Sequence, residues 1–358
     1  MKILFLTSNL KHDTNGGARF SWEVVSRVAE KHDVKVLVEE ESSKDEELVV
    51  LAKPKSVLGL IKNILVVRKF SKEYDLIHAL DGWPFAVYAH LGGRGKPFFV
   101  SGVGTYSVAP LEQNVKSILL RLAYKKAQKI LCISNYTKQE IIKRVKLQNL
   151  EVVTMGVDHK KFHDLGLPRK TNLVVGVGEV KYRKGFQAAV EAINKLVKKY
   201  PDLKYVIVGL YRKSSYTDKL KEYIQKNNLE KHIEFRSDVS DSDLVKLYNQ
   251  ASAFLLLPTN DRAHFEGFGL VFLEAAACGL PVIGTLGNGD EDAVDNEKNG
   301  FLVPQNNAPA AATALDKILS SPDLAQKFIK QGQSFAKTFI WEKTTTSYLR
   351  FYDSVRKN

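Results

Sequence analysis

The chain has 358 residues, 44% of them hydrophobic and 26% charged, which allows two domains with separate cores and is the balance of a globular protein rather than a membrane-embedded one. Its net charge of +13 predicts an anionic partner. Nucleic acid is not expected, because the basic residues are scattered among helices and no nucleic-acid-binding module is visible. A diphosphate compound and an anionic membrane surface would use the charge equally well, and a generally solvated basic surface is the alternative.

The cysteines and the first residues bear on the compartment. Cys132 and Cys278 lie in apolar segments far apart, which predicts buried, reduced thiols. Residues 1–7 predict a first strand, since their apolar part is too short for a signal peptide and polar residues follow at once. No apolar stretch reaches membrane-spanning length. We therefore expect a cytoplasmic protein, with peripheral binding to the inner face of a membrane as the alternative.

Strands and helical patterns alternate along the first half, as in a parallel α/β sheet. The predicted strands are 2–7, 34–39, 75–79, 97–101 and 129–133. Gly16 and Gly17 stand between the first strand and the helix that follows it. A tight turn is the default interpretation of such a pair.

The segment 53–72 has the pattern of a basic amphipathic helix. Leu58, Ile61 and Leu65 recur at helical spacing, and lysines and arginines flank them. Such a helix covers a sheet with its charged face in water, or alternatively lies on anionic lipid.

Three strands of the first half lead into segments with candidate functional residues. His78 closes the third strand, at the end where parallel sheets place ligand sites, and a hydrogen-bonded core histidine is the alternative. The fourth strand leads into Val103, Gly104 and Thr105. The fifth is followed by Ser134, which we expect to cap the next helix.

The second half begins after 165–170, a segment with linker character, and again alternates strands and helices. The predicted strands are 172–177, 204–209, 232–236, 252–257 and 281–285. Gly176 and Gly178 do not form a dinucleotide-binding fingerprint, because the third glycine is misplaced and no acidic residue sits where a ribose would need it.

A basic segment opens the first helix of the second half. Lys181, Arg183 and Lys184 precede Gly185 there. Cations at a helix N-terminus oppose the helix dipole unless an anion binds nearby, so the segment predicts an anion site. A helix start that is merely basic is the alternative.

The stretch 266–274 carries the strongest functional signal. Gly267 and Gly269 let the backbone approach a ligand and leave amide groups unpaired at a helix start, which suits a phosphate. The carboxylates of Glu266 and Glu274 suit sugar hydroxyls. The combination indicates a nucleotide-sugar site. An ordinary helix with an acidic N-terminus is the alternative, but it does not account for Glu274 among apolar residues.

Two acidic clusters have residue types that bind metals. Asp241 and Asp243 form a D-x-D pattern, but they open a helix for which Ser240 or Asp241 is the expected N-cap. The cluster at 290–292 is expected to cap a helix at 293–294. We therefore predict helix caps and no metal site.

The pair Glu266 and Glu274, the segment 275–281 and the Gly-Phe-Leu-Val run at 300–303 together resemble the donor-site signature of the family 4 retaining glycosyltransferases. The resemblance covers most of the chain and is specific in its second half. It implies the GT-B fold, in which two Rossmann-like α/β domains with parallel sheets face a cleft.

The resemblance also implies domain boundaries. An acceptor-side domain is expected at 1–168 and a nucleotide-sugar donor domain at 169–339. Residues 335–352 have the pattern of an amphipathic helix. The fold implies that 340–358 cross back to pack on the first domain.

Site residues follow from the same resemblance. Lys184 matches a lysine that contacts the donor diphosphate in the family. Glu179 stands where relatives carry an arginine, so Lys181 or Arg183 would have to replace that charge. Val103 stands where relatives carry a histidine directed at the donor sugar, which removes one sugar contact.

The implied catalytic residues are Glu266 and Lys184. The implied donor-binding residues are Gly16, Gly17, Arg183, Lys184, Glu266, Gly267, Phe268, Gly269, Leu270, Val271 and Glu274. The residues assigned to the acceptor or sugar side are His78, Val103, Gly104 and Thr105.

The implied reaction is transfer of a sugar, with retention, from a nucleotide-sugar to a hydroxyl of a glycan, a lipid-linked acceptor or a small molecule, without a metal or other cofactor. Another GT-B enzyme, such as an epimerase or phosphorylase, is one alternative. A degenerate nucleotide-sugar-binding module is the other. Val103 and Glu179 favour that module, whereas the intact pair of glutamates and Lys184 oppose it.

Overall fold

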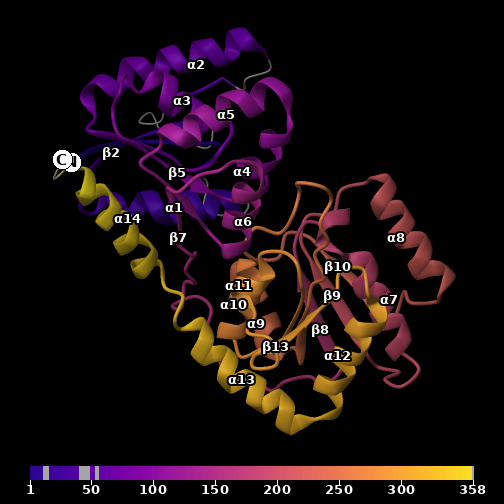
Figure 1. Ribbon diagram of the computed structural model, residues 1–358. Helices are drawn as coiled ribbons and strands as arrows, with labels where there is room; N and C mark the ends of the chain where they lie inside the picture. Colours follow the sequence, from indigo (N-terminus) through magenta and orange to yellow (C-terminus); the bar gives the residue numbers. More distant parts are fainter. Residues whose placement is uncertain (11–15, 40–48, 53–55, 357–358) are drawn as a thin grey trace. The chain divides into compact units, whose positions relative to one another are not determined.

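The computed structural model describes residues 1–10, 16–39, 49–52 and 56–356 (Figure 1). The chain forms two compact units. The first contains Met1–Gly156 and Trp341–Asn358, and the second contains Val157–Ile340. Each unit is built on one parallel sheet with helices packed against it.

The sheet of the first unit has the strand order β3-β2-β1-β4-β5-β6-β7. Its strands are β1 (Lys2–Thr7), β2 (Asp33–Val38), β3 (Val49–Val50), β4 (Leu76–Ala79), β5 (Phe98–Gly102), β6 (Lys129–Cys132) and β7 (Leu150–Val152). The central strands are apolar and buried along almost their whole length, as expected of a parallel sheet covered on both faces. The order reverses between β1 and β4, which makes the carboxyl edge there a topological switch point.

Helices cover both faces of this sheet. The helices are α1 (Gly16–Ala29), α2 (Val57–Phe70), α3 (Phe85–Gly92), α4 (Thr105–Val108), α5 (Asn114–Lys126), α6 (Asn135–Arg144) and α14 (Trp341–Arg356), with short 3-10 turns at Ser71–Glu73 and Ala109–Glu112. Right-handed crossovers put α2, α3 and α5 on one face and α1 on the other. The C-terminal helix α14 packs beside α1 (Figure 1).

The sheet of the second unit has the order β10-β9-β8-β11-β12-β13, so its switch point lies between β8 and β11. The strands are β8 (Leu173–Val177), β9 (Lys204–Val208), β10 (Ile233–Arg236), β11 (Ala253–Leu255), β12 (Val282–Thr285) and β13 (Gly300–Val303). The helices are α7 (Phe186–Leu196), α8 (Ser215–Lys226), α9 (Asp241–Gln250), α10 (Leu270–Ala277), α11 (Asp290–Ala293), α12 (Ala308–Ser320) and α13 (Pro322–Ala336), with a 3-10 turn at Tyr182–Lys184.

The α/β fold with two parallel sheets is confirmed, and each predicted strand is present to within two residues at its ends. Three edge strands were not predicted: β3 and β7 of the first sheet and β13 of the second. The segment 165–170, interpreted as a linker, belongs to the second unit. There Arg169 donates hydrogen bonds to the carbonyl oxygens of Ala251 (3.0 Å) and Cys278 (2.9 Å).

The prediction of one helix over 335–352 is wrong. Phe335 belongs to α13, the chain leaves the helix after Ala336, and α14 begins at Trp341. The break occurs because Phe339 and Ile340 pair with Val157: the Val157 amide donates to the Phe339 carbonyl at 3.1 Å. Backbone groups used in that bridge are lost to a continuous helix.

Helix caps follow the predictions in two places and not in a third. Ser134 caps α6 through the Thr137 amide, and Ser240 caps α9 through the Asp243 amide. Residues 290–292 do not cap a later helix, because they form α11 themselves. Cys132 and Cys278 are free and buried, as predicted. Within the described ranges, no helix is long and apolar enough to cross a membrane.

Candidate active site

Three loops of the second unit meet at the carboxyl edge of its sheet. They follow β8, β11 and β12, which are neighbouring strands on either side of the switch point. The loop after β8 carries Lys184, the loop after β11 carries Glu266, and the loop after β12 leads to Asp290. Open α/β sheets bind ligands at this place.

The charged centre of this edge consists of Glu266 and two cations. Lys184 Nζ donates to Glu266 Oε2 at 2.6 Å, and Arg183 Nη1 lies 3.4 Å from the same oxygen and 2.7 Å from the Phe265 carbonyl. The Glu266 side chain is only 14% exposed. Burial alone would raise the pKa of its carboxyl, but Lys184 and Arg183 outweigh burial and hold that pKa below its usual value. Glu266 is therefore ionised at neutral pH.

The loop after β8 holds a second ion pair. Lys181 Nζ lies 2.5 Å from Glu179 Oε2, and this hydrogen bond is the main reason that the pKa of Glu179 is lowered. Of the two cations expected to replace a missing arginine, Lys181 is therefore engaged by Glu179. Arg183 is the one that lies at Glu266 beside Lys184.

Glycines allow these loops to approach one another closely. Gly185 has φ +66°, and a Cβ there would lie 1.6 Å from the Leu257 carbonyl oxygen. Gly289 donates its amide to the Glu266 carbonyl at 2.9 Å, and a Cβ on it would lie 2.3 Å from the backbone of Gly267. Any side chain at either position would push the loops apart.

The start of α10 is open to a ligand. Its N-cap is Gly269, with φ +74° and no side chain to satisfy the first amides of the helix. Leu270 and Val271 are half-buried, whereas the rest of α10 is buried. Unpaired amides and the positive end of the helix dipole make this N-terminus suitable for a phosphate group.

Asp290 lies directly behind Gly269. It is fully buried, its Oδ2 accepts from the Thr285 amide at 3.1 Å, and its Oδ1 has no hydrogen-bond partner among the described residues. A Cβ on Gly269 would lie 2.9 Å from that Oδ1. Burial, together with the charge of Glu266, raises the pKa of Asp290 well above its usual value.

The other predicted donor residues fall into two groups. Gly267 is half-buried on the loop that precedes α10. Phe268 is 2% exposed and packs on Phe339 with ring centroids 6.0 Å apart, so it is a core residue. Glu274 lies in the second turn of α10 and is 3% exposed.

The carboxyl edge of the first sheet looks different. His78 is fully buried on β4; its Nδ1 is hydrogen-bonded to the Tyr352 hydroxyl and its Nε2 to Ser101 Oγ at 3.0 Å. Burial lowers the pKa of His78 to about 3. The structure therefore supports the alternative of a core histidine, here one that holds α14 against β4 and β5.

Asp81, which the sequence analysis missed, lies just beyond β4 at the switch point. Its Oδ1 accepts from the Gly82 amide (2.6 Å) and from Ser107 Oγ (2.9 Å), and no described residue donates to its second oxygen. Ser107 Oγ in turn accepts from the Val103 amide at 3.0 Å. The sequence signal that could have identified Asp81 is its position just after the strand that ends at Ala79.

The remaining predicted residues of the first unit lie near the same edge. Gly104 has φ +93° and is the N-cap of α4, whose first residue is Thr105. Gly16 and Gly17 are exposed in the first turn of α1. Among the residues that the structure describes, no group of three or more His, Cys, Asp or Glu side chains is arranged to hold a metal ion.

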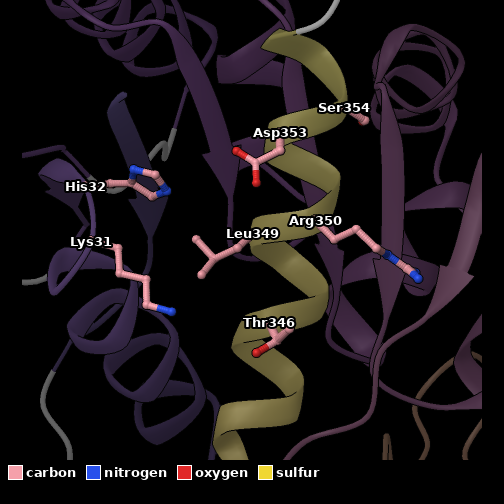
Figure 2. A pocket seen from close by; sticks show the side chains of 7 residues that line it. All are labelled: Lys31, His32, Thr346, Leu349, Arg350, Asp353 and Ser354. Carbon is pink, nitrogen blue, oxygen red and sulfur yellow. The ribbon is translucent and has the colours of Figure 1, made fainter.

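A pocket of about 680 Å³ lies on the first unit between α14 and the turn that precedes β2 (Figure 2). Leu349 and Asp353 point from α14 toward His32 and Lys31, whereas Arg350 points away (Figure 2). Lys31 and His32 stand just before β2, at the amino edge of the sheet. The pocket is therefore not part of the carboxyl edge where ligand sites are expected.

Comparison with known proteins identifies the family. Glycosyl transferases group 1 matches residues 157–335, and Glycosyltransferase Family 4 matches residues 14–161. An uncharacterized glycosyltransferase of Methanocaldococcus jannaschii is 26% identical over 80% of this chain and 77% of its own length. A D-inositol 3-phosphate glycosyltransferase of Corynebacterium urealyticum is 28% identical over 58% of this chain and about half, 51%, of its own length.

Solved structures agree on the fold. A sucrose-phosphate synthase from Thermosynechococcus elongatus superimposes with a TM-score of 0.83 over 100% of both chains at 19% identity. HepE of Anabaena, in complex with UDP and glucose, gives 0.83 over 99% of this chain and 100% of its own at 18% identity. These are GT-B enzymes. The chain has the GT-B fold and belongs to the glycosyl transferases group 1 family, as a glycosyltransferase.

Proposed function

We propose that this protein is a retaining glycosyltransferase that uses a nucleotide-sugar donor, requires no metal, and delivers the sugar to a hydroxyl of a glycan, a lipid-linked acceptor or a small molecule. The observation that carries the proposal is the ion cluster of Lys184, Arg183 and Glu266 beside the uncapped start of α10. It combines cations and amides for a diphosphate with a carboxylate for sugar hydroxyls.

The diphosphate is the part of the donor that this edge suits best. Lys184 and Arg183 bring two positive charges, and Gly269 and Leu270 offer amides at the helix start. When the bond from the sugar to the phosphate breaks, negative charge grows on the leaving diphosphate. Groups already fixed around that charge stabilise the transition state more than the ground state.

The two glutamates take different parts of the donor. Glu266 is held by Lys184 and Arg183 where the sugar hydroxyls would follow the diphosphate. Glu274, in the second turn of α10, is assigned to the ribose. Glu266 acts in the transition state, because its negative charge favours the positive character that the sugar ring gains. Glu274 contributes equally before and during the reaction.

We assign retention of the anomeric configuration to attack by the acceptor on the same face of the sugar from which the leaving group departs. The bond from the anomeric carbon to the phosphate oxygen breaks, the bond to the acceptor oxygen forms, and the acceptor proton passes to the released phosphate. A covalent route would need a carboxylate nucleophile. Glu266 is a poor candidate for it, since its charge is already engaged by two cations. The anomeric configuration of the product, determined by NMR, tests this assignment.

Relatives support the choice of donor. HepE has been crystallised with UDP and with UDP-glucose. The D-inositol 3-phosphate glycosyltransferases act, by their name, on a small phosphorylated acceptor, so relatives do not restrict the acceptor to lipids. We place the protein, as a proposal, in peripheral contact with an anionic membrane when its acceptor is lipid-linked.

The deciding experiment compares Glu266→Gln with Glu274→Ala on one donor, chosen by a thermal-shift screen of nucleotide-sugars. We expect Glu266→Gln to lower kcat and Glu274→Ala to raise the donor KM with little change in kcat. Circular dichroism checks folding. If both variants only weaken donor binding, Glu266 has no catalytic role, and if neither has an effect, the site is elsewhere.

Two controls separate the rival functions. Product analysis with and without added acceptor distinguishes sugar transfer from epimerisation or phosphorolysis, and donor binding without turnover on any acceptor would indicate a binding module. Activity is expected to survive EDTA. Loss with EDTA that magnesium or manganese restores would contradict the metal-independent site.

A further inference from the structure

The helix α2 exposes four of its nine large apolar side chains. Val57 is 73% exposed, Leu58 78%, Ile61 46% and Leu65 59%. The buried residues of α2 are only Asn63 and Val67, so the helix packs on the first unit by a narrow stripe. Large apolar side chains gathered on an outer face mark an interaction surface.

The helix α5 repeats this pattern, which the sequence analysis did not notice. Val115 is 70% exposed, Ile118 62% and Leu122 48%. In α5, the residues 115, 118, 122 and 125 are three apolar residues and a lysine. In α2, the residues 58, 61, 65 and 68 are three apolar residues and an arginine at the same spacing. Such spacing places each set on one side of its helix.

The two stripes belong to one face of the first unit. Both helices pack against α3, and all three lie on the same side of the sheet (Figure 1). Each follows a strand of a parallel sheet, so α2 and α5 run in the same direction and both begin at the carboxyl edge. The apolar residues therefore lie toward that edge, and Arg68 and Lys125 toward the other. We call the outward residues of these helices the α2–α5 face.

The charges on this face have one sign. Neither helix contains an aspartate or a glutamate. The cations of the two helices are Lys62, Arg68, Lys69, Lys116, Arg121, Lys125 and Lys126. A second copy of the chain on the same face would bring cations against cations. A nucleic acid would use the cations but would leave the apolar residues without a partner. A surface with anionic head groups over acyl chains matches both features.

We propose that the α2–α5 face binds the surface of an anionic phospholipid bilayer, with its apolar stripes inserted among the head groups and its cations on the lipid phosphates. This proposal specifies the surface that makes the membrane contact of the proposed function, and it relies on the proposed function for the lipid-linked acceptor. The carboxyl edge, where Asp81 lies, would then be held next to the membrane, within reach of a hydroxyl on a lipid-linked acceptor.

The test is co-sedimentation of the full chain with vesicles of phosphatidylcholine alone and of phosphatidylcholine mixed with phosphatidylglycerol. The wild type should bind the mixed vesicles, and high salt should weaken the binding. Leu58→Ser/Ile61→Ser and Ile118→Ser/Leu122→Ser should each reduce binding at least tenfold without changing the charge. The control Leu165→Ser/Leu210→Ser removes two comparably exposed leucines (42% and 46%) from the second unit and should bind like the wild type.

The proposal is overturned if the wild type does not bind the mixed vesicles, or if only one of the two double-serine variants loses binding. It is also overturned if the control variant loses as much binding as they do. A dimer in sedimentation velocity that the serine variants abolish would assign the face to a second copy. Binding of single-stranded RNA that Lys125→Gln/Lys126→Gln abolishes and the serine variants retain would assign it to nucleic acid. All changed residues are exposed, and thermal melts confirm folding. No step requires sugar transfer, so this proposal and the donor assignment fail separately.

Discussion

At their carboxyl edges the two sheets share a topology but differ in the charge of their side chains. The strand order reverses between β1 and β4 in the first sheet and between β8 and β11 in the second. In the second unit the edge holds Lys184, Arg183 and an ionised Glu266. In the first unit the candidate residues near the edge are His78, which is buried, and Asp81.

The difference is visible in the pKa values. Burial lowers the pKa of His78 to about 3, which leaves it neutral, and burial raises that of Asp81 to about 7. In the second unit, Lys184 and Arg183 outweigh burial and lower the pKa of Glu266. The second edge therefore holds fixed charges, whereas burial shifts His78 and Asp81 of the first edge toward their neutral forms.

The largest effect is expected from Lys184→Ala, which removes the cation closest to Glu266. We expect kcat/KM to fall by about 100-fold or more, because the leaving diphosphate loses a fixed positive charge. Steady-state kinetics and calorimetric binding of the nucleoside diphosphate measure it. Lys181→Ala is the matched control, since Lys181 lies on the same loop but pairs with Glu179. Equal losses in the two variants would mean that only the total charge of the loop matters.

A second large effect is expected from Gly269→Ala. The new Cβ would lie 2.8 Å from Phe272 and 2.9 Å from Asp290 Oδ1, at a φ of +74° that disfavours alanine. We expect the free energy of unfolding of the second unit to fall by about 1–3 kcal/mol. Donor binding should weaken as well.

Gly166→Ala is the control that separates the cost of a positive φ from the cost of the close contacts that Gly269→Ala would make. Gly166 also has a positive φ, +65°, in the same unit, but a Cβ there meets no atom within 4 Å. Urea denaturation followed by circular dichroism compares the two variants. If Gly166→Ala costs as much stability and Gly269→Ala binds donor normally, the α10 N-terminus is not the phosphate site.

The second unit was the more predictable one, because its site depends on local backbone features. Gly267 and Gly269 before an apolar helix, and Lys184 before Gly185, are patterns that short stretches of sequence display. Asp290 was misread as a cap, because its role depends on Thr285 and Gly269, which are close only in the folded unit. No local rule predicts a contact of that kind.

The first unit was predictable as a fold but not as a site. Its five inner strands were found from apolar runs, since burial on both faces leaves a plain signal. His78 was placed at the right strand end, yet its partner Tyr352 is 274 residues away, on α14. Asp81 was overlooked because a single aspartate after a strand is common in turns. Its significance comes from Ser107, which holds it from another loop.

Asp81→Asn tests whether the first edge is uncharged. Since the pKa of Asp81 is about 7 in the folded chain and about 3.9 when unfolded, the folded chain retains a proton that the unfolded chain releases between these values. Stability therefore falls as pH rises through this window and levels off above pH 7. Asparagine cannot ionise, so the variant should gain stability relative to the wild type from about pH 4 to 7.

Tryptophan fluorescence is a suitable probe for this variant, because Trp22, Trp83 and Trp341 all belong to the first unit. Asp33→Asn, in which an aspartate side chain that is 63% exposed is replaced, is the control for loss of a carboxylate in the same unit. A difference that is flat with pH for Asp81→Asn would mean that its carboxyl is ionised in the folded chain throughout. The contrast between the two edges would then fail.

The smallest effect is expected from Glu179→Arg, which asks how far the charge of the second edge can be raised. Glu179 is the one acidic residue of the loop that carries Lys181, Arg183 and Lys184, and its pair with Lys181 partly neutralises that loop. Arginine there would both add a positive charge and release Lys181. At a partly exposed site this is worth on the order of 1 kcal/mol, or about fivefold tighter binding of a nucleoside diphosphate.

Asp316→Arg is the matched control. Asp316 also pairs with a lysine, Lys199, at 2.7 Å, but that lysine follows the C-terminal end of α7, at the amino edge of the same sheet. Calorimetry at low and high salt should show a gain for Glu179→Arg that salt removes and none for Asp316→Arg. A gain in both variants would mean that net charge alone attracts the ligand, and a gain in neither would mean that Glu179 does not face the phosphates.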